Sequence, residues 1–356
     1  MDIDPATIQR NYGTAAEESR DDERTDPRVK AASQQRAELN SWIFRTIAIA
    51  LLLVLTVWVL GDLFLRDDIG RQPSRPGKKI THIASLGSSF AAGPGIPPQV
   101  EPVAGQSGVN YARLLTTALN TSNNGNAGPV NLTDLSVSGA TLLNLISEPQ
   151  HWQGRVYAPQ IDDLPSDADL VLVLGGGNDL DYIGGLMRES AAAGWVAWDA
   201  EGEEERWAPR LQELKSAEAL ARRYAVVLDV IHDAAPHAAV LVIEYLTLLG
   251  DDFIPGRHAP FDGDRTAHHR HVAEMLLNGT AQAVEGREGW CHIVEAGRLS
   301  TGHGVGSETP WVSDFQGISV LSGVPYHPNA AGMQAIEHMI VQKMIDLGLI
   351  DDGGEL

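Results

Sequence analysis

Cysteine is nearly absent from the sequence, with Cys291 alone among 356 residues. A single thiol excludes an intramolecular disulfide and any zinc site built from several cysteines. The segment CHIVEA around Cys291 carries no motif of a cysteine nucleophile. We therefore expect it to be a small buried residue at the start of a strand.

Positive charge is also scarce. The chain has 26 Lys and Arg against 47 Asp and Glu, a formal net charge of -21 at pH 7, and no run of Lys or Arg offsets it. Such a chain repels a phosphate backbone, so nucleic acid is not an expected partner. The phosphate-binding patterns G-x-x-x-x-G-K-[ST] and G-x-G-x-x-G are absent as well.

The N-terminal region divides into a polar and an apolar part. Residues 1–41 hold six basic and nine acidic side chains with few large apolar ones, so we expect a disordered tail. No charge interrupts Thr46 to Gly61, and we predict a single transmembrane helix over 42–65, because about twenty apolar residues span a bilayer core. A buried core helix is the alternative, although such helices are usually shorter. A cleaved signal peptide fits less well, since the apolar run starts late and lacks a small-x-small site.

Two features indicate opposite orientations of this span. Arg36 and Arg45 lie before the uncharged stretch that begins at Thr46, and five basic residues follow within 66–79, which by the positive-inside rule favours a cytosolic domain. Three N-x-S/T sequons, at Asn120, Asn131 and Asn278, fit a lumenal or extracellular domain instead.

Strand and helix patterns alternate after the basic Pro/Gly linker at 66–79. Strands are predicted at 80–86, 130–137, 170–174, 240–244 and 292–295, and helices near 107–119, 216–235, 264–284 and 329–347. This alternation predicts an α/β domain over 80–350, with a parallel sheet covered on both faces and function at the carboxyl ends of the strands. Residues 351–356 form an acidic tail.

The first predicted strand ends in a Gly-rich turn, IASLGSSFAAGPGI, which places Ser89 at the functional edge. Taken alone, this segment is better interpreted as an ordinary Gly/Ser turn. The next two strands end in LSVSGATLLN and LVLGGGNDLD, which offer the backbone N–H of Gly139 and the amide of Asn178. Acyl transfer needs such donors for the oxyanion of its intermediate. Gly139 could instead serve only a turn, and Asn178 a helix cap.

A serine hydroxyl needs an adjacent base to act as a nucleophile, and histidine is the usual one. His327 has the most suggestive setting of the twelve histidines, because it stands directly before Pro328 and a helical run in VPYHPNAAGMQAIEHM. A position at a helix N-terminus disfavours the imidazolium, so the ring should be neutral at pH 7.

Four blocks now occur in a fixed order: G-S-S-F at 87–90, S-G at 138–139, G-G-N-D at 176–179 and Y-H-P-N-A-A-G-M at 326–333. They resemble the four sequence blocks of SGNH (GDSL-like) hydrolases, and the resemblance covers about 80–350. It implies a three-layer α/β/α fold with a five-stranded parallel sheet of the flavodoxin type, and a serine esterase without cofactor or metal.

By this resemblance the nucleophile is Ser89, the base is His327, and the oxyanion hole is formed by Ser89, Gly139 and Asn178. Two positions depart from the family pattern. Ser88 replaces the acidic residue of G-D-S, and Val324 stands where an acid normally precedes the histidine by three residues.

The missing acid makes the chain similar to the branch of the secreted Streptomyces esterase, in which a backbone carbonyl orients the histidine of a Ser-His dyad. We therefore expect the carbonyl of Val324 to accept the ring N–H of His327, with the Asp314 carboxylate as the less favoured substitute. Because the family is largely secreted, we favour a lumenal or extracellular domain.

The expected reaction is hydrolysis of a carboxylic ester, of a lipid or an O-acyl carbohydrate. An acyltransferase using the same acyl-enzyme is one alternative. A catalytically silent binding or scaffold protein on the same fold is another, suggested by Val324.

The sequence allows two roles for each of two other segments. The Trp-rich insertion 191–210 could line an acyl or sugar site or could pack onto the domain. The histidines at 268, 269 and 271, with Asp262 and Asp264 nearby, could bind a metal, but a solvated helical face is the favoured interpretation.

Overall fold

The computed structural model describes residues 79–121, 129–192, 216–315 and 324–351. The chain divides into two units at residues 75 and 76, and all described residues belong to the second. The predicted tail, the predicted span 42–65 and nearly all of the linker lie outside the described residues, as does the tail from 352 on. Among the helices that are described, none has both the length and the apolar character to cross a membrane.

A five-stranded parallel sheet forms the centre of the domain, with strand order β4-β1-β7-β8-β9. Its strands are β1 (His82–Gly87), β4 (Asn131–Asp134), β7 (Leu170–Leu174), β8 (Ala239–Ile243) and β9 (Cys291–Val294). Every residue of the middle strand β7 is buried, as expected for an apolar run covered on both faces. All five predicted strands are confirmed, and the order is that of a flavodoxin-type doubly wound sheet.

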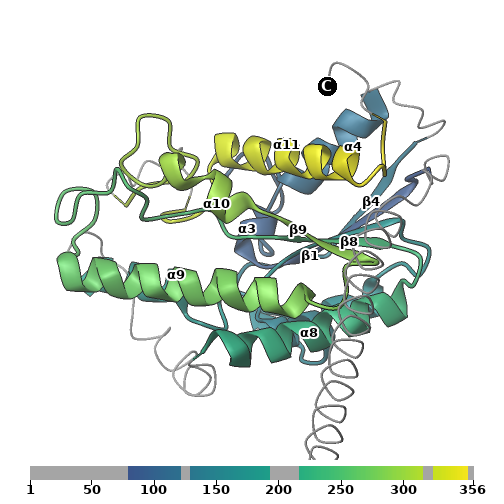
Figure 1. Ribbon diagram of the computed structural model, residues 1–356, viewed down its shortest axis with the longest axis horizontal. Helices are drawn as coiled ribbons and strands as arrows, with labels where there is room; N and C mark the ends of the chain where they lie inside the picture. Colours follow the sequence, from purple (N-terminus) through teal and green to yellow (C-terminus); the bar gives the residue numbers. More distant parts are fainter. Residues whose placement is uncertain (1–78, 122–128, 193–215, 316–323, 352–356) are drawn as a thin grey trace, which may run out of the picture. The chain divides into compact units, whose positions relative to one another are not determined.

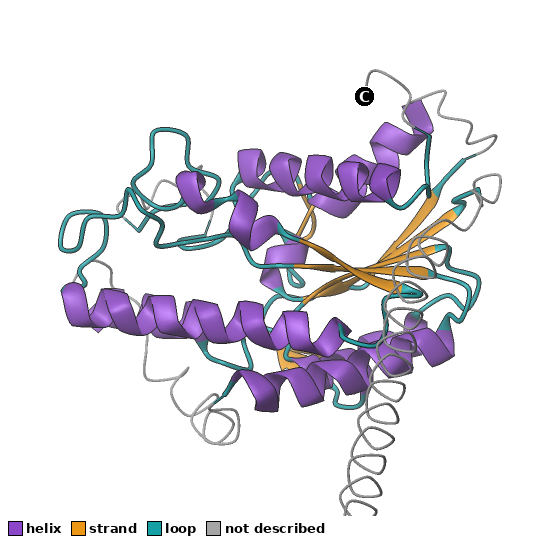
Figure 2. Ribbon diagram, viewed as in Figure 1, coloured by secondary structure: helices purple, strands orange, loops and turns teal. Residues whose placement is uncertain are grey.

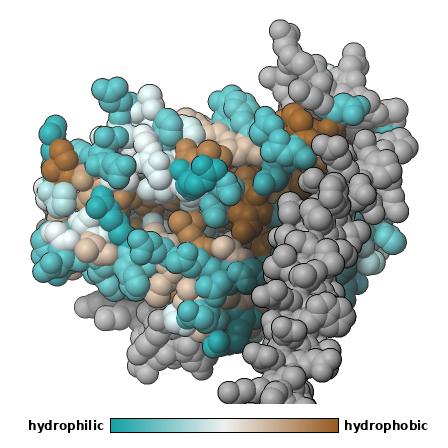
Figure 3. Space-filling model, viewed as in Figure 1, coloured by the Kyte–Doolittle hydropathy of each residue, from teal (hydrophilic) through white to brown (hydrophobic). Residues whose placement is uncertain are grey.

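Helices cover both faces of this sheet (Figures 1 and 2). One layer contains α4 (Tyr111–Thr121) and α11 (Ala330–Asp346), and the other contains α8 (Ala217–Ala234) and α9 (Gly263–Val284). The face drawn in Figure 3 has polar side chains over the helices and apolar ones gathered between the layers. These four helices match the predicted ones to within a few residues.

Three of the long helices have a polar side chain at the N-cap. Ser216 accepts a hydrogen bond from the N–H of Ala219, Asp262 from that of Arg265, and Asn329 from that of Gly332. Each bond satisfies one of the free amides of the first turn and fixes where the helix begins. For α11 this start lies directly after the predicted His327–Pro328 turn.

Several elements at the carboxyl edge of the sheet were not predicted. They are the short helices α3 (Ser89–Ala92), α5 (Leu142–Ile146) and α10 (Ala296–Leu299), the 3-10 helices η1 (Gln160–Asp163) and η2 (Thr301–His303), and the longer helix α6 (Tyr182–Ala192). Two antiparallel hairpins, β2–β3 (Gln99–Glu101, Gln106–Ser107) and β5–β6 (Gln150–Trp152, Arg155–Tyr157), also lie outside the main sheet. An ion pair of 3.0 Å between Arg155 and Glu101 joins these hairpins.

Candidate active site

The tight turn between β1 and α3 positions Ser89. Gly87 has φ 153, and a Cβ there would collide with the carbonyl oxygen of Leu174 on the neighbouring strand. The buried side chain of Gln160 holds both backbone groups of Gly87, accepting from its N–H at 2.8 Å and donating to its carbonyl at 2.9 Å. Ser89 therefore lies at a fixed point of the carboxyl edge of the sheet, as predicted, and is the first residue of the short helix α3.

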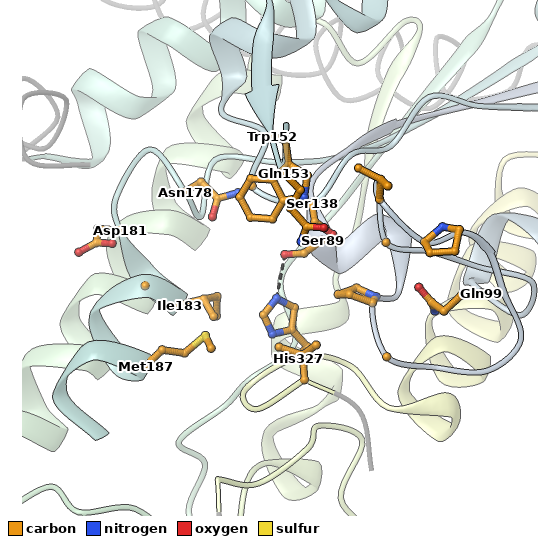
Figure 4. A pocket seen from close by; sticks show the side chains of 18 of the residues that line it. Ser89, Gln99, Ser138, Trp152, Gln153, Asn178, Asp181, Ile183, Met187 and His327 are labelled. Atoms are coloured by element: carbon orange, nitrogen blue, oxygen red, sulfur yellow. Dashed lines mark hydrogen bonds between the residues drawn. The ribbon is translucent and has the colours of Figure 1, made fainter. Parts of the chain in front are cut away.

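Ser89 and His327 are in direct contact although 238 residues separate them in the chain. Ser89 Oγ lies 2.8 Å from Nε2 of His327, and the two residues are 8% and 6% exposed (Figure 4). Nδ1 of the same ring lies 2.9 Å from the carbonyl oxygen of Pro325. Because a carbonyl only accepts, Nδ1 is the donor in that bond, and in a neutral ring Nε2 is then free to accept the serine proton.

Burial keeps the His327 ring neutral. Desolvation lowers its pKa from 6.5 to about 4, and the hydrogen bond to the Pro325 carbonyl opposes this shift without reversing it. The ring is therefore in the protonation state that a general base requires at pH 7.

The carbonyl that orients this ring is not the expected one. Val324 was predicted to provide it, but the Val324 carbonyl accepts the backbone N–H of His327 at 3.2 Å instead, and the ring faces Pro325. The reason is the left-handed conformation of Tyr326, φ 58, which turns the chain between Pro325 and His327. Asp314 is exposed, and no hydrogen bond or ion pair in the described chain joins it to His327.

The three predicted oxyanion donors line one cavity with Ser89 and His327. Gly139 has φ 79, and a Cβ on it would lie 2.5 Å from the ring of Trp152, so only glycine fits. Within the described residues no hydrogen bond occupies the N–H of Ser89 or of Gly139. Asn178 donates one amide hydrogen to the carbonyl of Ala140 at 2.8 Å, which fixes the side chain and leaves its second amide hydrogen available.

The cavity has a volume of about 380 Å³ and mixed walls. In Figure 4, Ile183 and Met187 of α6 lie on one side of the Ser89–His327 pair, Gln99 lies on the other, and Trp152 lies above. Pro94, Pro102 and Val103 add further apolar surface, whereas Gln153 and the ion pair of Asp181 with Arg188 make part of the lining polar. A volume and lining of this kind suit a small organic ligand.

None of these wall residues was predicted from the sequence. Trp152 lies on an unpredicted hairpin, and Ile183 and Met187 lie on an unpredicted helix. Trp195, Trp198 and Trp207 of the insertion 191–210, for which lining a site and packing onto the domain were both left open, fall outside the described residues.

Buried polar contacts support the turns that carry the donors. Ser88, which replaces the family's acidic residue, places its Oγ 3.0 Å from the hydroxyl of Tyr245. That hydroxyl also accepts the N–H of Gly177 at 3.3 Å. The serine thus joins the turn after β1 to the turn after β7, a structural contact that needs no carboxylate.

Asp179, next to Asn178, is fixed in a similar way. Its carboxylate accepts the N–H of Leu142 at 2.9 Å and pairs with Arg223 at 3.2 Å. Burial raises the Asp179 pKa to about 6 although both partners lower it. Within the G-G-N-D block, the side chain of Asn178 therefore lines the cavity, whereas that of Asp179 is held by α5 and α8.

The histidine cluster on α9 is not arranged around a common point. His269 is buried 3.1 Å from Glu189 of α6, and Asp262 caps the helix. Across the described ranges, no group of three or more His, Cys, Asp or Glu side chains could hold a metal ion. Cys291 is buried at the start of β9, as predicted, and burial raises its pKa to about 12.

A doubly wound α/β/α domain with a serine and a histidine in contact at its carboxyl edge has the architecture of the SGNH hydrolases. A model of the GDSL-like Lipase/Acylhydrolase family matches residues 85–335, and the chain belongs to this family of carboxylic ester hydrolases.

Solved structures agree on the fold. Phospholipase A1 from Streptomyces albidoflavus NA297 is similar with a TM-score of 0.53 and 19% identity, over 74% of this chain and 98% of that one. An extracellular lipase from Streptomyces rimosus is similar with a TM-score of 0.50 and 20% identity, again over 74% and 98%. No curated protein matches the sequence.

Proposed function

We propose that this protein is a serine esterase that hydrolyses carboxylic esters through an acyl-enzyme on Ser89. The observation that carries the proposal is the buried contact of 2.8 Å between Ser89 Oγ and His327 Nε2, inside a cavity that also holds unused hydrogen-bond donors. Nucleophile, base and donors are the three parts that acyl transfer requires.

In the first half-reaction Ser89 Oγ attacks the ester carbonyl and its proton passes to Nε2 of His327. The oxyanion accepts hydrogen bonds from the N–H groups of Ser89 and Gly139 and from the amide of Asn178. The C–O bond to the alcohol then breaks, and the imidazolium returns its proton to the leaving oxygen.

In the second half-reaction water replaces the alcohol. His327 removes a proton from this water, the hydroxide attacks the acyl carbonyl, and the acid leaves as Ser89 recovers its proton. The carbonyl of Pro325 keeps the ring in one orientation throughout both steps and selects the tautomer of the neutral ring, while the imidazolium lacks the stabilisation that a carboxylate would give.

The walls of the cavity favour an ester with an apolar acyl chain. Trp152, Ile183 and Met187 form an apolar surface beside Ser89, and each methylene buried there contributes about 0.8 kcal/mol. The alcohol then contacts the polar part of the lining, which includes Gln99, Gln153 and the ion pair of Asp181 with Arg188. An acylglycerol or another O-acyl polyol meets this description.

The test uses the full chain in detergent with p-nitrophenyl butyrate as substrate. Ser89→Ala and His327→Ala should each lower kcat by at least about 1,000-fold. His268→Ala, an exposed histidine on α9, is the matched control and should keep wild-type activity. Unchanged hydrolysis in either of the first two variants would exclude this mechanism.

Two further measurements test the alternative functions. Labelling of Ser89 by a fluorophosphonate would exclude a catalytically silent domain. Transfer of the acyl group to an added polyol in preference to water would indicate an acyltransferase.

A further inference from the structure

Tyr326, directly before the base, has an unusual backbone conformation. It is fully buried and has φ 58. The left-handed region is uncommon for residues other than glycine, and a bulky side chain makes it a true outlier that persists only where its surroundings enforce it. Outliers of this kind concentrate where function needs a particular geometry, so the contacts that enforce this one are of interest.

The Tyr326 hydroxyl has a specific partner far away in sequence. It lies 2.8 Å from Oγ of Ser190, and both residues are 0% exposed. The ring stacks against Phe261 and against Phe315, with centroid separations of 6.3 and 5.6 Å. The backbone N–H donates to the Ser313 carbonyl at 2.9 Å. Contacts of the backbone N–H, the ring and the hydroxyl thus hold Tyr326 in place.

The conformation of Tyr326 decides which carbonyl faces His327. In an ordinary right-handed or extended conformation the peptide between Pro325 and Tyr326 would point elsewhere, and Nδ1 would lose its acceptor at 2.9 Å. In the described chain no carboxylate contacts His327, so this carbonyl alone selects the tautomer.

Ser190 belongs to the helix that forms one wall of the cavity. α6 presents Ile183 and Met187 to the cavity and, one to two turns later, Ser190 to the hydroxyl of Tyr326. The helix that contacts the substrate therefore also anchors the turn that carries the base.

We propose that Tyr326 and Ser190 are positioning residues: their hydroxyl pair locks the left-handed turn that aims the Pro325 carbonyl at His327, in the place where related enzymes use an acid. This inference rests on the proposed esterase function and adds residues that the family's sequence blocks do not assign.

The experiment compares Tyr326→Phe, Ser190→Ala and the double variant in the full chain. Each should lower kcat for p-nitrophenyl butyrate by about 10- to 100-fold with KM within about twofold, because a small misplacement of the base affects the chemical step and leaves binding intact. Phosphonylation of Ser89 by a fluorophosphonate should slow by the same factor. The double variant should be no slower than the slower single one, as expected for groups that act together.

Thr280→Val is the matched control. Its hydroxyl is also buried and bonded, to the Leu276 carbonyl at 2.8 Å within α9, but it does not touch the His327 turn. It should lower thermal stability without changing kcat. The inference is overturned if Tyr326→Phe and Ser190→Ala, like Thr280→Val, leave both kcat and the rate of phosphonylation unchanged. If Ser89→Ala and His327→Ala are inactive in the same experiment, the proposed esterase function still stands.

Discussion

Burial of His327 sets the pH range in which the Ser89–His327 pair works. A base acts only when unprotonated, and the His327 pKa lies at about 4, so kcat/KM should remain constant from pH 8 down to about 5 and fall only as the pH passes through about 4. Initial rates with p-nitrophenyl butyrate at constant ionic strength check this. An acid limb near 6.5 would contradict the burial of the ring in the working enzyme.

The lowered pKa of His327 also makes the free energy of unfolding depend on pH, so stability must be measured together with activity. The unfolded histidine binds a proton near pH 6.5 and the folded one only near 4, so the stability gained from a neutral buried ring is present above 6.5 and is lost as the pH falls through this window. Circular dichroism at each pH distinguishes unfolding of the domain from protonation of His327 in the folded protein.

Gly139 offers a second prediction for a single residue. Gly139→Ala adds a Cβ that collides with Trp152 and displaces the backbone N–H, and loss of one oxyanion donor lowers kcat by about 100- to 1,000-fold. Gly154→Ala is the control, because Gly154 has the same left-handed φ of 80 with nothing within 4 Å of an added Cβ. The control should lose stability through backbone strain, by about 1 to 2 kcal/mol, and should keep activity. Equal activity losses in both variants would mean that strain, and not the donor, is the cause.

The sequence predicted the contacting pair and the donors because Ser89, Gly139 and Asn178 lie in short blocks after strands β1, β4 and β7. The block of His327 leads into the terminal helix α11, which begins at the same edge of the sheet. It predicted the wrong carbonyl, Val324 in place of Pro325, because the choice depends on one backbone angle. Nothing in the letters VPYHP indicates that Tyr326 adopts φ 58; buried contacts from distant residues enforce it.

At the level of whole elements, the five strands and four long helices were readable because buried strands are continuous apolar runs and covering helices have a 3.6-residue period. Helix α6 was missed because Gly184 and Gly185 lower its helix propensity. A Cβ at position 184 would collide with the Asp181 carboxylate, so a larger residue there would displace that side chain. The hairpins were missed because strands of two or three mostly polar residues show no alternation.

The wall formed by α6 should set acyl-chain preference. Met187→Ala enlarges the cavity beside Ser89, so the optimum in a series of p-nitrophenyl esters from C2 to C12 should move to longer chains. Each methylene newly accommodated should raise kcat/KM by about fourfold, from about 0.8 kcal/mol of burial. Met339→Ala on α11, partly buried and outside the cavity, is the control. An unchanged chain-length profile would place the acyl group on another wall.

Asp179 connects three elements, and its loss should be costly to the fold. Asp179→Ala leaves the buried N–H of Leu142 and the guanidinium of Arg223 without this partner. Breaking a buried pair in this way typically costs about 3 to 5 kcal/mol. Urea unfolding followed by circular dichroism measures the change in the free energy of unfolding, and a loss below about 1 kcal/mol would show that the pair is not structural.

For the molecule as a whole, membrane attachment through 42–65 stays a prediction. Deleting residues 1–78 should release the protein from the carbonate-washed membrane fraction, while hydrolysis of a soluble ester should be unchanged, because every proposed site residue lies within the described domain. Continued sedimentation of the deleted form with membranes would refute this attachment. Protease protection in sealed vesicles then decides between the lumenal or extracellular side that we favour and the cytosolic side.

The 238-residue separation of Ser89 and His327 has a consequence for how the protein becomes active during synthesis. The proposed nucleophile Ser89 leaves the ribosome with the first strand, whereas the proposed base His327 follows only after the last strand of the sheet. A nascent chain therefore carries its serine through nearly the whole of translation without the group that activates it. On the proposed mechanism, hydrolysis can begin only when the two ends of the domain have met, so an incomplete chain is expected to be inactive.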